Sequence, residues 1–146
     1  MNFLIVNCFA TWLVEWCTLF KRFIGKQEDV VPDHHKIDYV EFGSPDPEAT
    51  RSFFETAFGW RFEEFENYLA FHGAGLDGGI FPAELAGRAD RGGPLIVFYS
   101  LDIAASESLV RKHGADIIKP CFAFPGGRRF HFTEPAGNEF AVWSDL

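Results

Sequence analysis

Apolar and polar residues alternate in short runs from residue 37 onward, and two of these runs are each followed by a helical pattern. The first run, at 37–42, is β-prone and leads to a predicted helix that begins at Asp46. Asp46 is an N-cap aspartate followed by proline, and Gly59 is a typical left-handed helix stop. The same unit returns further on, with Asp102 as its N-cap and Gly114 as its stop. The sequence thus contains one strand–helix pattern twice.

Short strand-like runs complete each unit, separated by glycine- and proline-rich turns. The predicted strands after the helices lie at 61–65, 68–72, 79–81, 116–119, 129–133 and 139–143. The predicted inward positions of the helices are Ala49, Phe53, Phe54, Ala57, Phe58, Ala105, Leu109 and Val110. We therefore expect an α+β domain of two tandem βαβββ modules, about 36–90 and 94–146, that form a cupped mixed sheet.

A separate apolar stretch precedes this domain. Residues 3–20 are almost all apolar, and their few polar side chains recur at three- and four-residue steps, so the pattern predicts an extra N-terminal helix. Its apolar surface could pack against its own domain or a second subunit, lie in a membrane interface, or span the membrane. A carboxylate in mid-bilayer costs a few kcal/mol, so Glu15 disfavours the spanning alternative. We expect an appendage of helix and charged linker at 1–31 and a domain at 32–146.

The amino-acid composition limits the kinds of ligand, partner and compartment to expect. Aromatic residues make up 17% of the 146-residue chain, and rigid rings often line binding cavities. The net charge of -8 disfavours nucleic acid as a partner, because the charge would repel a phosphate backbone. Three cysteines without CxxC spacing fit a reducing compartment, so a cytoplasmic location is expected.

Four segments, in order, resemble the vicinal oxygen chelate superfamily, which includes glyoxalases, bleomycin resistance proteins and extradiol dioxygenases. They are the helix cap at 46–48, the helix end at 53–60, the second cap at 99–102, and the turn Glu-Pro-Ala-Gly-Asn with its final strand at 134–143. The resemblance covers about residues 36–145. It implies the tandem βαβββ fold and a site for a small molecule on the strands.

Metal-dependent members of this superfamily place His or Glu ligands on the first and last strands of each module. The matching positions here are Tyr39, Ile96 or a neighbour, and Ala141. None is a convincing ligand for a divalent metal, so no cofactor is predicted. A metal-dependent enzyme stays open as an alternative, because a one-residue register slip changes which residues face the site.

Strand alternation gives candidate site residues. His131 and Glu41 are the candidate catalytic residues, His131 for moving a proton and Glu41 as a base or a partner. The candidate ligand-binding residues are Tyr39, Arg129, Glu139 and Trp143. An equally open alternative is that Arg129 pairs with one of the glutamates and His131 is structural. Core packing is the alternative for the two aromatic candidates.

Two function classes remain. The first is a glyoxalase-like protein that binds a small organic molecule, with anions among the candidates, in an aromatic-lined cup without the usual metal ligands. The second is a lyase or isomerase of the same superfamily, metal-independent or metal-dependent. In either case we expect a homodimer, because family members often pair and because the apolar helix needs to be covered.

A truncated chain that starts near Pro32 tests the role of that helix. If residues 1–31 supply the dimer contact, light scattering will give the full chain twice the mass of a monomer and the truncated chain the mass of one. A truncated chain that stays soluble with the dimer mass would rule the segment out as the dimer element.

Overall fold

The computed structural model describes residues 34–146, and residues 37–146 form one compact unit. The predicted N-terminal helix at 3–20 lies outside the described residues. Within 34–146, neither helix combines the length and the apolar content that crossing a bilayer requires.

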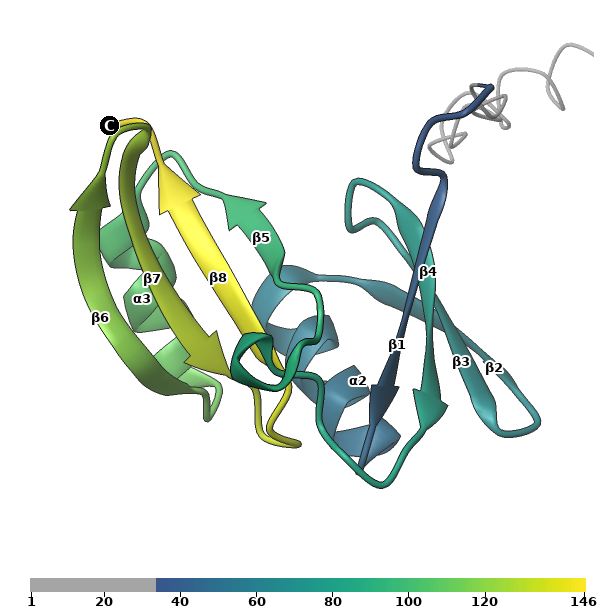
Figure 1. The fold of residues 1–146 in the computed structure, drawn as a ribbon. Helices are drawn as coiled ribbons and strands as arrows, with labels where there is room; N and C mark the ends of the chain where they lie inside the picture. The colour runs from purple at the N-terminus through teal and green to yellow at the C-terminus, as the bar shows by residue number, and fades with distance from the viewer. Residues whose placement is uncertain (1–33) are drawn as a thin grey trace, which may run out of the picture. The chain divides into compact units, whose positions relative to one another are not determined.

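Within residues 34–146, eight strands form two four-stranded sheets, ordered β1-β4-β3-β2 and β5-β8-β7-β6 (Figure 1). The first sheet contains β1 (Tyr39–Ser44), β2 (Arg61–Phe65), β3 (Tyr68–His72) and β4 (Asp77–Pro82). The second contains β5 (Ile96–Tyr99), β6 (Asp116–Phe124), β7 (Gly127–Thr133) and β8 (Glu139–Ser144). In each sheet the first and last strands of the module are parallel and the other neighbours are antiparallel. The α+β class and the two βαβββ modules are confirmed.

Each module has one long helix, and local side-chain chemistry sets where it begins. Helix α2 (Pro47–Phe58) begins after Asp46, whose carboxylate accepts a 3.0 Å hydrogen bond from the backbone N–H of Ala49. It ends at Gly59, whose φ of 69° is left-handed. Helix α3 (Ile103–Lys112) has the equivalent cap at Asp102. A 3-10 turn, η1 (Ala89–Arg91), lies in the connection between the modules.

The residues predicted to face inward are all buried or partly buried in α2, but only some of them are in α3. Phe53, Phe54 and Ala57 are buried in α2. In α3 the buried residues are Ile103 and Val110, whereas Ala105 is exposed. The prediction for Ala105 is wrong because the first turn of α3 directs Ile103, not Ala105, toward the core.

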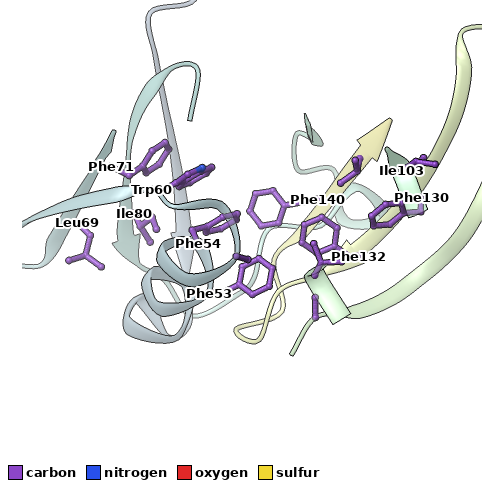
Figure 2. Packing of buried hydrophobic residues seen from close by; sticks show 14 residues of the cluster. Phe53, Phe54, Trp60, Leu69, Phe71, Ile80, Ile103, Phe130, Phe132 and Phe140 are labelled. Carbon is purple, nitrogen blue, oxygen red and sulfur yellow. The ribbon is translucent and has the colours of Figure 1, made fainter. Parts of the chain in front are cut away.

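An aromatic cluster joins α2 to both sheets (Figure 2). Phe54 is completely buried, and its ring stacks on Trp60 at a centroid distance of 4.1 Å. On its other side Phe54 meets Phe140 of β8 edge-on at 5.1 Å. Phe53 of the same helix lies 5.9 Å from Phe132 of β7. The helix of the first module therefore supplies core to the sheet of the second.

The turn before β8 is held by a buried carboxylate. Glu134 accepts hydrogen bonds from the backbone N–H groups of Ala136 and Asn138 and from Nδ2 of Asn138, at 2.7–3.1 Å. Burial raises the pKa of Glu134, and these hydrogen bonds lower it in part. The amide oxygen of Asn138 accepts from the N–H of Gly87 at 2.6 Å. This turn therefore also fixes the connection between the modules.

Replacing Phe54 with alanine will test the aromatic cluster. The variant removes a fully buried ring at the junction of α2 and both sheets, so we expect a loss of about 3–5 kcal/mol in the free energy of unfolding. Urea denaturation followed by fluorescence measures it. Phe65→Ala is the matched control, because Phe65 is 52% exposed and its loss should cost less than about 0.5 kcal/mol. Equal losses in the two variants would contradict the central place of Phe54.

Candidate functional site

Strand pairing in the second sheet gathers the candidate residues on one face. On β7 and β8, Arg129 lies opposite Trp143, His131 opposite Ala141, and Thr133 opposite Glu139. Phe130, Phe132, Phe140 and Val142 alternate with them and belong to the core on the other face. We call the side with Arg129, His131, Glu139 and Trp143 the Arg129 face.

The edge strand β6 adds two residues that simple alternation does not predict. Its pairing with β7 shifts between Ile117 and Lys119, and again between Lys119 and Phe122. Each shift inserts one extra residue, as a β-bulge does, and so reverses the face of the residues that follow. As a result Lys119 lies opposite His131, and Phe122 lies opposite Arg129. Both residues therefore belong to the Arg129 face.

A buried pair of hydrogen-bonded side chains, His131 and Glu139, forms the centre of this face. Nδ1 of His131 lies 2.9 Å from Oε1 of Glu139, and the two side chains are 3% and 2% exposed. The second carboxylate oxygen, Oε2, accepts a 3.0 Å hydrogen bond from the backbone N–H of Ala89. The backbone N–H of Glu139 donates to the carbonyl oxygen of Gly87 at 2.8 Å. The connection between the modules thus holds Glu139, and Glu139 holds His131.

These contacts set the charge of Glu139 and the orientation of the imidazole. Burial by itself raises the pKa of the Glu139 carboxyl, but the hydrogen bonds from His131 and Ala89 and the electrostatic attraction of His131 and Lys119 outweigh it. The pKa therefore lies below its ordinary value of 4.5, and the carboxylate is ionised at neutral pH. An ionised carboxylate only accepts hydrogen bonds, so Nδ1 of His131 carries the proton. Nε2 then points away from Glu139 and has no hydrogen-bond partner within residues 34–146.

Arg129 is held by aromatic rings and not by a carboxylate. Its guanidinium carbon lies 5.4 Å from the ring centroids of both Phe122 and Phe124. Its Nε atom is buried without a hydrogen-bond partner, and among residues 34–146 no carboxylate forms an ion pair with it. Trp143 lies nearby, with its ring 6.3 Å from Phe124 and 5.2 Å from Tyr99. The Arg129 face therefore combines a cation, a histidine and flat apolar surface.

The structure places the other two candidates, Tyr39 and Glu41, on the first sheet. The Tyr39 hydroxyl donates to the carbonyl oxygen of Gly78 at 2.8 Å and lies 2.7 Å from the hydroxyl of Tyr68. Tyr68 donates to Glu41 at 2.7 Å, and it reaches across Gly79, where a Cβ atom would collide with the Tyr68 hydroxyl. No hydrogen bond within 34–146 joins this group to His131. The structure thus separates Glu41 from His131 and pairs His131 with Glu139.

Sequence reasoning missed Tyr68, Phe122, Phe124 and Lys119 as neighbours of the candidates. Alternation places Phe122 and Lys119 correctly only if the two bulges of β6 are known, and Pro120 within that run is a signal of irregular pairing. The signal for Tyr68 was the run of two glycines at 78–79, which leaves room for a large side chain to cross the neighbouring strand.

The residues at the metal positions of the superfamily do not fit a divalent metal. Val97 pairs with Ala141 on β5 and β8, so the neighbour of Ile96 occupies the expected face. Neither Val97 nor Ala141 offers an oxygen, nitrogen or sulfur donor in its side chain. Across residues 34–146, no three His, Cys, Asp or Glu side chains are grouped to hold a metal ion. The polar chemistry of this face therefore comes from Arg129, His131, Glu139 and the exposed Lys119.

Comparison with solved structures relates the fold to glyoxalase-type proteins. A glyoxalase/bleomycin resistance protein/dioxygenase family enzyme from Burkholderia phytofirmans PsJN is 16% identical with a TM-score of 0.63, covering 75% of this chain and 100% of its own. A glyoxalase-related enzyme from Fulvimarina pelagi is 17% identical with a TM-score of 0.60, covering 76% of this chain and 88% of its own. Lactoylglutathione lyase from Agrobacterium tumefaciens is 18% identical with a TM-score of 0.59, covering 77% of this chain and 96% of its own. At such identities the likeness establishes the fold alone.

No curated protein sequence is significantly similar to the chain. The family model of the Glyoxalase/Bleomycin resistance protein/Dioxygenase superfamily matches residues 36–142, which include both modules up to the last strand. The match agrees with the two βαβββ modules and with the strand order of each sheet. The chain therefore belongs to the glyoxalase/bleomycin resistance protein/dioxygenase superfamily.

Proposed function

We propose that this chain is a small-molecule binding protein whose Arg129 face takes a small organic anion. The observation that carries the proposal is the state of Arg129. Its guanidinium lies against two phenylalanine rings, and its Nε is buried without a partner among residues 34–146. The chain has 21 acidic and 13 basic residues, so carboxylates that could neutralise an arginine are plentiful. An arginine that nevertheless faces aromatic rings is suited to an external anion.

The rings prepare Arg129 for this role. A planar guanidinium presents its N–H groups in one plane, and that geometry matches a carboxylate or a phosphate. Contacts with Phe122 and Phe124 restrict the plane before the ligand arrives, which lowers the entropy lost on binding. A hydrogen bond to a charged partner contributes about 1.5–3 kcal/mol. Trp143 adds flat apolar surface for the body of the ligand. Tyr39 and Glu41 are not part of the proposed binding site, because they contact Tyr68 on the other sheet.

A second candidate function is a lyase or isomerase that needs no metal. The buried pair of His131 and Glu139 favours it, because a carboxylate that fixes one imidazole nitrogen leaves the other free to accept a proton. In that reaction Arg129 would hold the anionic group, Nε2 of His131 would take a proton from the substrate, and Glu139 would stabilise the imidazolium. The same residues thus serve binding alone or binding with proton transfer.

We also propose that the protein is a homodimer in the cytoplasm. Membership of a superfamily whose members often pair favours the dimer, and the apolar stretch at 3–20 offers surface for it. The cytoplasmic location is supported by the odd number of cysteines and the absence of CxxC spacing in the sequence.

Benzoate binding tests the role of Arg129 directly. We expect isothermal titration calorimetry to detect benzoate and not uncharged benzamide. In Arg129→Met the dissociation constant should rise between about ten-fold and a hundred-fold, because a charge-assisted hydrogen bond is lost.

Arg128→Met is the matched control, because Arg128 is the exposed neighbour on the same strand. Its affinity for benzoate should match that of the unmodified protein. Equal affinity of the Arg129→Met variant would contradict the proposal. Thermal unfolding of each variant separates a lost contact from a lost fold, and NMR of the recovered probe distinguishes binding from turnover.

The acid dependence of stability tests the Glu139 contacts. Because its pKa is lowered in the folded state, Glu139 stabilises the fold above its unfolded pKa near 4.5, and this contribution disappears as the pH falls through the folded pKa. In Glu139→Gln we expect a loss of about 1 kcal/mol at pH 7 that shrinks toward zero near pH 3. Urea denaturation at several pH values measures it. Glu63→Gln, at an exposed position, should follow the unmodified protein at every pH. A loss in Glu139→Gln that does not change with pH would refute this account.

A further inference from the structure

Two buried hydrogen-bonding atoms of the Arg129 face have no partner within residues 34–146. They are Nε of Arg129 and Nε2 of His131. Buried polar groups are nearly always hydrogen-bonded, because leaving one unpaired costs the full free energy of removing it from water. Two such atoms on alternate residues of one strand therefore indicate which hydrogen-bonding groups a ligand at this face must carry.

The two atoms have opposite hydrogen-bonding character. Nε of a guanidinium always donates. In the neutral form of His131, Nδ1 donates to the ionised Glu139, so Nε2 accepts. A ligand that satisfies both atoms must carry an acceptor for Arg129 and a donor for His131. A simple anion satisfies only the first.

The positions and surroundings of Arg129 and His131 indicate what part of the ligand joins its acceptor to its donor. Arg129 and His131 are alternate residues of β7, so their Cα atoms lie about 6.8 Å apart. Both side chains therefore lie on the same face of the sheet, where one ligand can contact both. Phe122, Phe124 and Trp143 provide aromatic surface around Arg129.

We infer that the ligand is a hydroxyaryl carboxylate. Its carboxylate accepts from Nε of Arg129, and its hydroxyl, across the ring, donates to Nε2 of His131. This inference rests on the proposed function. It narrows the ligand from organic anions to aromatic carboxylates that carry a hydrogen-bond donor on the opposite side of the ring.

Phe122 lies beside both side chains. Its ring lies 5.9 Å from the imidazole of His131 and 5.4 Å from the guanidinium carbon of Arg129, and the residue is 37% exposed. It sits on the edge strand, directly after the second pairing shift of β6. The inference requires this side chain to turn aside when the ligand binds, and Phe124 then keeps the guanidinium in its plane.

Glu139 is a positioning residue for this selectivity, and its amide variant gives a distinctive test. Oε2 of Glu139 accepts from the N–H of Ala89, and Oε1 faces Nδ1 of His131. In Glu139→Gln the amide oxygen must stay on Ala89, so the NH₂ group donates to Nδ1. The imidazole proton then moves to Nε2, which becomes a donor. Both hydrogen bonds are kept without the charge of the carboxylate, and the character of Nε2 is reversed.

The experiment compares 4-hydroxybenzoate with 4-methoxybenzoate and benzoate by calorimetry. Unmodified protein should bind 4-hydroxybenzoate about ten-fold more tightly than 4-methoxybenzoate, which corresponds to one hydrogen bond. In Glu139→Gln the ratio should fall to about one, because both probes offer an oxygen to Nε2–H. In the control Glu63→Gln the ten-fold ratio should persist. The ¹⁵N signal of Nε2 in the unmodified protein should move with 4-hydroxybenzoate and stay with benzoate, which gives a readout independent of any variant.

The possible results distinguish a failure of the inference from a failure of the proposed function. If benzoate binds through Arg129 and the hydroxyl adds no affinity, the inference is wrong and the proposed function stands. If the ten-fold ratio survives in Glu139→Gln, the role of Nε2 as acceptor is wrong. If neither benzoate nor 4-hydroxybenzoate binds, or if both bind Arg129→Met as well as the unmodified protein, the proposed function fails and the inference fails with it.

Discussion

The burial of Phe140 constrains the rest of this structure. Its ring lies on β8 among Phe54 of α2, Phe98 of β5 and Phe42 of β1, so one side chain joins both modules. Because successive side chains of a strand point to opposite faces, a buried Phe140 forces Glu139 and Ala141 onto the other face. Core packing between the modules thereby decides which residues form the Arg129 face. A one-residue slip of β8 would bury Glu139 in the aromatic cluster, at a cost that excludes it.

On the Arg129 face, the charged groups of Glu139 and Arg129 have different surroundings. Glu139 is fully engaged by His131 and by the backbone of Ala89, so its charge is compensated inside the protein. Arg129 lies against rings, which favour a cation without neutralising it. The contrast has a physical consequence: the carboxylate organises the site, and the guanidinium remains available to an incoming group. The first sheet differs, because Tyr39, Tyr68 and Glu41 satisfy one another.

Much of the fold was predictable, because it depends on local chemistry. The caps at Asp46 and Asp102 and the period-two alternation of β8 are written in short stretches of sequence, and the structure agrees with both. The site was predictable only in part. Which glutamate meets His131 depends on how β7 pairs with β8, and the position of Phe122 depends on two bulges in β6. Such features come from long-range pairing, which the alternation within one strand does not specify.

The central claim is that Arg129 binds an anion. The Nε–H resonance of this residue reports on that binding most directly. Two-dimensional ¹H–¹⁵N NMR of arginine side chains during a benzoate titration will follow it. The account predicts that the Arg129 signal shifts progressively and saturates, while the signal of Arg51, which is paired with Glu55 on α2, stays in place. An Arg129 signal that does not move while benzoate binds elsewhere would contradict the account.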